Sequence, residues 1–169
     1  MILGTKGTTL QNLKLKKSKI PKTYVFKVNR FKKNQDVYCE IIRSKFKGDL
    51  AVRSSNYFED KSMSSLAGKF HSSLNISSGS KRDIITSINK TIKSYKNYKH
   101  KNNEILIQSM VPNVKCSGVI FTKDLKTNSP YIKINYTNSK DTTLVTSGKG
   151  NPETFTYFKN SILKPKEIL

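Results

Sequence analysis

Short runs of β-branched and aromatic residues, separated by polar turns, constrain the fold of this chain most. Such residues favour strands, and the run at 131–136 also alternates at period two, as a half-buried strand does. The polar turn 137–141 joins it to the run 142–146, which predicts an antiparallel hairpin. Six strands are expected, at residues 24–28, 50–53, 105–108, 118–122, 131–136 and 142–146.

Three stretches have the periodicity or the boundary signals of helices. In residues 80–98, Ser80 is a suitable N-cap, and Asp83 adds a favourable negative charge to the first turn. Helices are also expected at 36–46 and at 8–14. Because helices and strands follow one another irregularly, the order indicates an α+β fold. The apolar stripe of the first helix comprises Ile84, Ile85, Ile88, Ile92 and Tyr95.

The size and composition fit a globular protein with one domain. The chain has 169 residues, of which 35% are hydrophobic, and such a length can enclose a core. No run of about 18 apolar residues predicts a membrane helix, and the N-terminus does not resemble a signal peptide. A cytoplasmic protein is therefore expected. Cys39 and Cys116 lack metal-binding spacing and are interpreted as small buried apolar residues.

The net charge of +21, from 32 basic and 11 acidic residues, attracts polyanions. A non-enzymatic basic protein that coats nucleic acid is therefore one alternative. Only four basic residues are arginines, however, and base-reading surfaces depend strongly on arginine. The lysines are also spread over every segment, which favours a general compositional bias over a dedicated nucleic-acid surface.

Two segments could bind phosphate. In the first, Gly4 and Gly7 flank Lys6 ahead of a helix, where free N–H groups and a lysine favour an anion. In the second, Arg53 ends an apolar strand and can donate two hydrogen bonds to a phosphate. The alternative for Arg53 is a surface ion pair with one of the acids at 59–60.

Three further segments could contact a nucleotide. Residues 64–72 combine small residues and glycine, which suits a phosphate-covering loop; His71 is expected to pack in the strand that follows, and His100 to be solvated. Residues 104–122 could form an adenine hinge with Met110 on the ring, or simply two core strands joined by a proline turn. After the strand ending near 146, glycines precede Lys149. No arrangement typical of a hydrolase is present.

Taken in order, these segments resemble the N-terminal ATP-binding domain of pyruvate phosphate dikinase and phosphoenolpyruvate synthase. Residues 50–60, LAVRSSNYFED, resemble VAVRSSATAED, and residues 105–122, ILIQSMVPNVKCSGVIFT, resemble VVVQKMVPADVSGVLFT. Shorter similarities are found at 3–7 (LGTKG), 20–26, 65–76 (SLAGKFHSSLNI) and 144–158.

The resemblance implies a shortened ATP-grasp domain over residues 1–169, in which ATP lies between two lobes, 1–100 and 101–169, built from mixed or antiparallel sheets and a few helices. It implies that Lys6 and Arg53 hold phosphates and act in catalysis. The implied phosphate-covering loop comprises Ala67, Gly68 and Lys69, and the implied adenine hinge comprises Gln108, Ser109, Met110 and Val111.

The resemblance also implies the cofactors ATP and Mg²⁺ and a kinase that phosphorylates a histidine on a separate, pyruvate-related domain or subunit. Asn135 stands at or beside the family's metal-binding glutamate, and an amide binds Mg²⁺ more weakly than a carboxylate. Because no phosphohistidine domain is present in these residues, the chain is expected to need a partner for turnover. It is interpreted as a fragment, a split subunit or a degenerate nucleotide-binding relative.

Overall fold

A computed structural model describes residues 4–16, 18–59, 68–139, 141–147 and 151–158. The chain divides into two compact units, residues 1–110 and 111–169. This division falls after Met110, whereas the sequence-based lobe boundary lies at 100/101. None of the described helices is long and apolar enough to cross a membrane.

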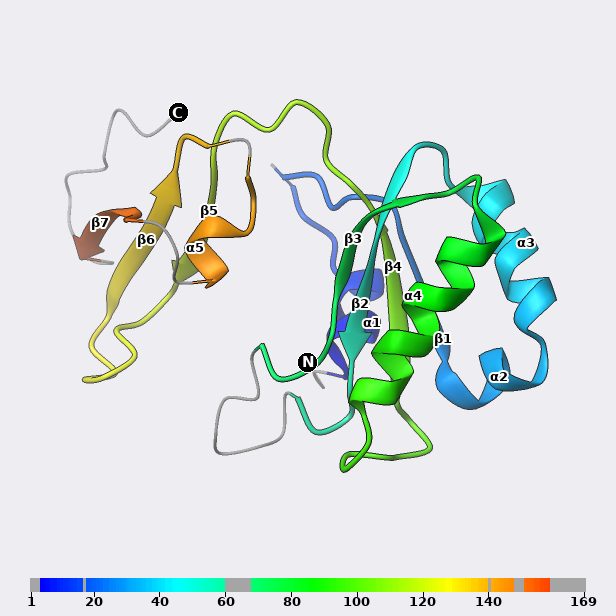
Figure 1. The fold of residues 1–169 in the computed structure, drawn as a ribbon. Coiled ribbons are helices and arrows are strands. Elements are labelled where there is room, and N and C mark those ends of the chain that lie inside the picture. The colour runs from blue at the N-terminus through cyan, green and yellow to red at the C-terminus, as the bar shows by residue number, and fades with distance from the viewer. Residues whose placement is uncertain (1–3, 17, 60–67, 140, 148–150, 159–169) are drawn as a thin grey trace. The chain divides into compact units, whose positions relative to one another are not determined.

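Unit 1 is built on a four-stranded antiparallel sheet with the strand order β1-β4-β2-β3 (Figure 1). The central strands β2 and β4 pair along six consecutive positions, from Leu50 opposite Ser109 to Ser55 opposite Glu104. The elements of this unit are α1 (Lys6–Asn12), β1 (Thr23–Lys27), α2 (Val28–Lys33), α3 (Gln35–Lys45), β2 (Asp49–Ser55), β3 (Ser73–Ser77), α4 (Lys81–Ser94) and β4 (Glu104–Ser109).

One face of this sheet, called here the helical face, holds the hydrophobic core. Alternate residues of β2 and β4 point to it, and Val52 and Ile107 lie opposite each other with no exposed surface. The amphipathic helices α3 and α4 supply the other half of the core. Its main members are Phe26, Phe31, Cys39, Ile42, Phe46, Leu50, Val52, Ile84, Ile88, Tyr95, Ile105 and Ile107.

The intervening residues of the same strands form the opposite face, called here the polar face. Helix α1 packs on this face against β1 and β4. Its Gly7 is buried, and a Cβ atom there would lie 2.8 Å from Cγ1 of Val25. Because such a distance is a collision, only glycine lets α1 approach the sheet this closely.

Unit 2 contains a three-stranded antiparallel sheet with the order β5-β6-β7. Among its described residues none is fully buried, so its strands are held mainly by their pairing. A salt bridge of 2.7 Å joins Lys133 to Asp124 at the β5–β6 turn. The elements are β5 (Ser117–Phe121), β6 (Tyr131–Thr137), α5 (Leu144–Ser147) and β7 (Glu153–Phe158).

The α+β class is confirmed, and most predicted elements are present with ends shifted by a few residues. Ser80 caps α4 as predicted by accepting a hydrogen bond from the Asp83 N–H group. The strand predicted at 142–146 is wrong, because this stretch contains a turn and the short helix α5, and β6 pairs with β5 and β7 instead. None of its branched residues is buried there, and local propensity alone did not decide the structure.

Candidate functional site

The polar face of the unit 1 sheet brings together two of the residues expected to bind nucleotide. Arg53 on β2 lies opposite Leu106, and Gln108 is two residues further along the same strand, β4. Residues two apart on a strand point to the same face, so Arg53 and Gln108 are diagonal neighbours. Helix α1, which begins with Lys6, covers part of this same face. Lys6, Arg53 and Gln108 therefore share one side of the sheet.

The Arg53 guanidinium contains a buried donor that is unsatisfied within the part of the chain that the structure describes. Its Nε atom is buried, and among the described residues nothing accepts its hydrogen bond. A buried donor without an acceptor costs about 1–3 kcal/mol, and more when the group is charged. An anion that reaches the polar face would remove this cost, since a phosphate can accept from two N–H groups of one guanidinium.

Lys6 is held by an acidic residue. Its Nζ atom lies 3.5 Å from Oε1 of Glu59, whose side chain is 11% exposed. The other oxygen of Glu59 accepts from the Ser54 hydroxyl, and from the Asn56 N–H group. The sequence offered Glu59 as an ion-pair partner of Arg53, but the structure pairs it with Lys6. Asp60, the other acid considered for Arg53, lies outside the described residues.

The first turn of α1 does not present the free N–H groups that the sequence suggested. The Gly7 N–H group donates to the Ser55 hydroxyl over 2.8 Å, and the Thr8 N–H group donates to the Thr5 hydroxyl. The Thr9 N–H group bonds to the Thr5 carbonyl. The expectation of an anion bound by these amides is therefore wrong, and the glycine serves the contact between helix and sheet.

Glu104 fixes α1 to the polar face, a role that the sequence analysis missed. Its carboxylate is 9% exposed and accepts hydrogen bonds from the hydroxyls of Thr5, Thr8 and Ser55. Hydrogen bonds to a charged acceptor are the stronger kind. The three hydrogen bonds to Glu104 therefore set the position of α1, the helix that begins with Lys6. Because the donors are 49 to 99 residues away in the sequence, no local pattern could have indicated them.

The expected adenine hinge lies at the end of β4. Gln108 is half-buried, and its Nε2 atom donates to the Thr23 hydroxyl over 3.5 Å. The Ser109 and Met110 N–H groups donate to the carbonyls of Lys22 and Asp49, each over 2.9 Å. Those two N–H groups are therefore already bonded within the protein. Val111, the fourth hinge residue, begins unit 2 and is 55% exposed.

The expected phosphate-covering loop is described only in part, because Ala67 lies outside the described residues. Gly68 has a φ of +77° and is exposed, and Lys69 lies 4.6 Å from the centre of the Tyr98 ring and donates to the Tyr98 hydroxyl. The lysine is thus attached to the loop that follows α4.

Both histidines differ from the sequence-based expectation. His71 precedes β3 instead of lying in it, and it is exposed, with Nε2 bonded to the Ser73 hydroxyl over 2.9 Å. His100 is half-buried, and its ring stacks on Tyr57 at 3.9 Å and 15°. The interpretation of His100 as a merely solvated residue is therefore wrong.

Asn135, the expected metal ligand, lies in the middle of β6. Its side-chain oxygen accepts from the Thr154 hydroxyl over 3.0 Å, and the neighbouring residue on its face is Lys133. In the part of the chain that the structure describes, no three His, Cys, Asp or Glu side chains gather as metal ligands do. Mg²⁺ prefers carboxylate oxygens, so these residues do not by themselves fit a magnesium site. Lys149 lies outside the described residues.

One sheet face of this α+β unit thus carries an arginine whose buried Nε atom has no acceptor among the described residues, a lysine from the covering helix and an amide. The family described as "Pyruvate phosphate dikinase, AMP/ATP-binding domain" matches residues 31–166, which is most of the chain. The chain belongs to this family of nucleotide-binding domains. None of the curated proteins matches the chain significantly.

Proposed function

We propose that the chain is the ATP-binding domain of a phosphotransferase of the pyruvate phosphate dikinase type. In this proposal Arg53 and Lys6 hold the phosphates of ATP on the polar face. The terminal phosphate then passes to a histidine on a separate domain or partner protein. Membership of the AMP/ATP-binding family supports nucleotide binding; the residue roles and the transfer step are the proposal.

The observation that carries the proposal is the Arg53 side chain. Its buried Nε atom has no acceptor among the described residues, although the sheet around it is closely packed and Leu106 opposite it is fully buried. The side chain is half-buried, and the planar guanidinium favours recognition of a phosphate through two hydrogen bonds at once. An arginine kept for an ion pair would be expected to have a carboxylate beside it.

Lys6 and Gln108 extend the proposed site along the same face. Lys6 would exchange its Glu59 partner for a phosphate oxygen, and its side chain is 38% exposed and thus accessible to a ligand. Gln108 would contact the base together with Met110 and Val111, whereas the N–H groups of Ser109 and Met110 remain bonded within unit 1. Ala67, Gly68 and Lys69 would cover the phosphates; the φ of +77° at Gly68 is a conformation that glycine adopts without strain.

The proposed chemistry relies on positioning and charge neutralisation. Phosphoryl transfer needs little covalent participation from the protein, and this site contains no nucleophile of its own. Magnesium commonly binds through substrate phosphates and only one or two protein groups. We therefore propose that Mg²⁺ would arrive with the nucleotide and be held mainly by its phosphates.

Isothermal titration with ATP and with AMP, each with Mg²⁺, tests the role of Arg53. The Arg53→Ala variant should bind ATP at least about tenfold more weakly, because two charge-assisted hydrogen bonds are lost. AMP, with a single phosphate, should be affected much less.

Arg82→Ala is a matched control, since Arg82 is an exposed arginine on α4. Equal losses for ATP and AMP would remove Arg53 from the phosphate-binding role, and a folded protein that releases no heat with millimolar ATP would contradict the function.

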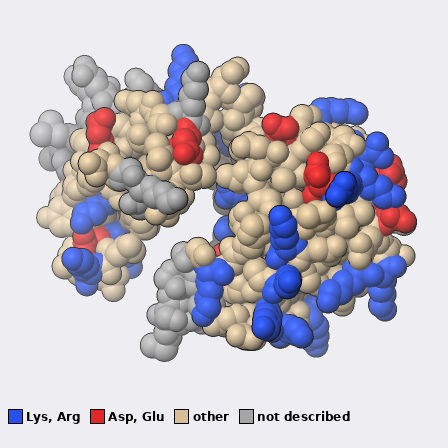
Figure 2. Space-filling view, viewed as in Figure 1, with Lys and Arg blue, Asp and Glu red and all other residues tan. Residues whose placement is uncertain are grey.

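The nucleic-acid alternative makes a different prediction. Figure 2 shows Lys and Arg side chains spread over the face of unit 1 in view, with uncharged surface between them and few acidic groups. A protein that coats nucleic acid would bind DNA or RNA tightly, and its affinity would fall steeply with salt. Filter binding at two salt concentrations separates the two functions, since an ATP site built on buried groups is screened less. ATP binding without phosphate transfer to any histidine would instead indicate a degenerate relative.

A further inference from the structure

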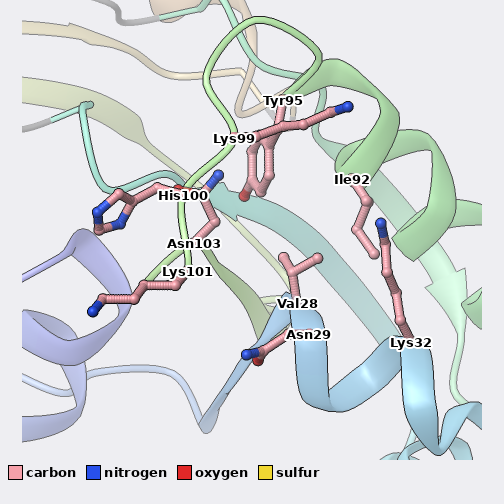
Figure 3. A pocket seen from close by; sticks show the side chains of 9 residues that line it. All are labelled: Val28, Asn29, Lys32, Ile92, Tyr95, Lys99, His100, Lys101 and Asn103. Carbon is pink, nitrogen blue, oxygen red and sulfur yellow. The ribbon is translucent and has the colours of Figure 1, made fainter.

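A pocket with a volume of about 390 Å³ lies on the helical side of unit 1 (Figure 3). Pockets for small ligands commonly start near 300 Å³, so this one has room for a compact molecule. It is formed where α2, the last turn of α4 and the loop before β4 meet. The lining residues are Val28, Asn29, Lys32, Ile92, Tyr95, Lys99, His100, Lys101 and Asn103.

The charge of this pocket has one sign. Three lysines contribute to the lining and no carboxylate does. Lys32 reaches up from α2 toward Ile92, and Lys99 extends from the loop past Tyr95 toward α4, whereas His100 and Lys101 extend the other way (Figure 3). Among the described residues neither Lys32 nor Lys99 has an ion-pair or hydrogen-bond partner, and both are exposed at the rim. Neither amine at the rim is therefore neutralised by a carboxylate among the described residues.

The polar groups at the base of the pocket are already used by the protein. The Tyr95 hydroxyl donates to the Glu104 carbonyl over 2.7 Å and accepts from the Ser55 N–H group over 2.9 Å. The Asn103 side chain bonds to the Tyr57 N–H group and to the Tyr98 carbonyl. Tyr95 itself is only 3% exposed, so the base offers a ligand very little surface of any kind.

The wall beside these groups is apolar as well. Val28 and Ile92 are half-buried and pack against the hydrophobic core. Their outer surfaces line the pocket. The pocket thus combines an apolar interior with a cationic rim, an arrangement complementary to a molecule that has an apolar ring at one end and an anion at the other.

We propose that this pocket binds a small aromatic or aliphatic phosphomonoester. A phosphomonoester carries nearly two negative charges at neutral pH, which matches the two free amines of Lys32 and Lys99. Its organic part packs on the outer surfaces of Val28 and Ile92. The site is separate from the polar face that holds Arg53, because Ile92 and Tyr95 belong to the helix that covers the other side of the sheet.

A small ligand fits these observations better than a nucleic acid does. The free amines stand over a concave apolar wall, whereas a nucleic-acid backbone requires a row of cations along an extended surface. The aromatic rings near the pocket are also occupied: the Tyr95 ring packs edge-on against Phe70, and His100 stacks on Tyr57. They offer no stacking platform for successive bases.

NMR titration of the ¹⁵N-labelled full chain with phenyl phosphate tests the proposal. The amides of residues 28–32 and 99–103 should shift saturably, with ATP present or absent and in the Arg53→Ala variant. Phenyl phosphate should bind about tenfold or more tightly than inorganic phosphate or phenol, because each of these lacks one half of the recognition. Lys32→Gln with Lys99→Gln should weaken binding by at least about tenfold.

The control is the double variant Lys47→Gln with Lys90→Gln, which removes the same charge from two exposed lysines outside the pocket. It should change the affinity by less than about twofold, because exposed distant charges are largely screened. An equal loss in both double variants would overturn the proposal in favour of general charge attraction. Three other results would overturn it as well. These are amide shifts confined to the polar face, complete displacement of phenyl phosphate by ATP, and tighter binding of a single-stranded oligonucleotide than of phenyl phosphate at the same amides.

Discussion

The two faces of the unit 1 sheet are made by alternate residues of the same strands, yet they have different properties. Val52 on β2 and Ile107 on β4 enter the apolar core. The next residue on each strand, Arg53 and Gln108, lies on the opposite face, where Gln108 donates a hydrogen bond to the Thr23 hydroxyl. The period of two lets a short strand stabilise the fold through one set of side chains and present binding groups through the other. Substitutions on the two faces should therefore separate stability from binding.

The largest effect is expected for Ile107→Ala on the helical face. Ile107 has no exposed surface and packs among helices and strands of the core. Truncation to alanine should lower the free energy of unfolding by about 2–5 kcal/mol through lost burial and a residual cavity. Urea denaturation followed by circular dichroism measures this loss. ATP affinity should stay nearly unchanged in the folded Ile107→Ala variant. If it fell as much as in Arg53→Ala, the inference that one face supports stability and the other supports binding would be wrong.

A smaller effect is expected for Gly7→Ala, which tests the packing of α1 on the polar face. The added Cβ would lie 2.8 Å from Val25 and 3.0 Å from the Ser55 hydroxyl, which accepts from the Gly7 N–H group. Overpacking of this kind costs about 1–3 kcal/mol, against a gain of about 1 kcal/mol in helix propensity. The thermal midpoint should fall modestly, whereas ATP affinity should fall clearly because Lys6 moves with α1. Thr9→Ala, in the same helix, is the control; unchanged ATP affinity in the glycine variant would show that Lys6 does not depend on this contact.

A third test uses the unmodified protein and concerns coupling between the two faces. Cys39 on α3 is fully buried, and burial raises the pKa of its thiol above the ordinary value. Cys116 is exposed, so the expectation that both cysteines are buried is wrong for Cys116. A thiol reagent should label Cys116 quickly and Cys39 only when unit 1 opens. Saturating ATP should slow the labelling of Cys39 by about tenfold to hundredfold, because ligand binding stabilises the folded state. A rate for Cys39 that ATP leaves unchanged would show that the nucleotide does not bind unit 1.

Much of the fold could be predicted from sequence because the signals are local. The stripe of isoleucines and the Ser80 cap define α4, and branched residues mark β2 and β4. The run 142–146 has the same composition, but it is not a strand, because no neighbouring strand in the described residues pairs with it. Pairing is a tertiary property that composition does not contain.

For the candidate site, the sequence indicated residues but not how they are placed. Lys6, Arg53 and Gln108 were found through a resemblance that covers motifs along the chain, and their location on one sheet face follows from register, which the sequence does not give. The Glu104 contacts, the Lys6–Glu59 pair and the His100–Tyr57 stack join residues that are between 43 and 99 positions apart. Such contacts arise only from the assembled fold.

The salt bridge between Lys6 and Glu59 has a consequence for how strongly a phosphate could be held. In the proposed site the contact with Glu59 already restricts the ammonium group, so less rotational freedom of this side chain would be lost on binding. The incoming anion must also compete with a carboxylate, which subtracts from the attraction it gains. The contribution of Lys6 to affinity is therefore the free energy of its contact with phosphate minus that of its contact with Glu59. A small difference of this kind favours release of a product as much as binding of a substrate.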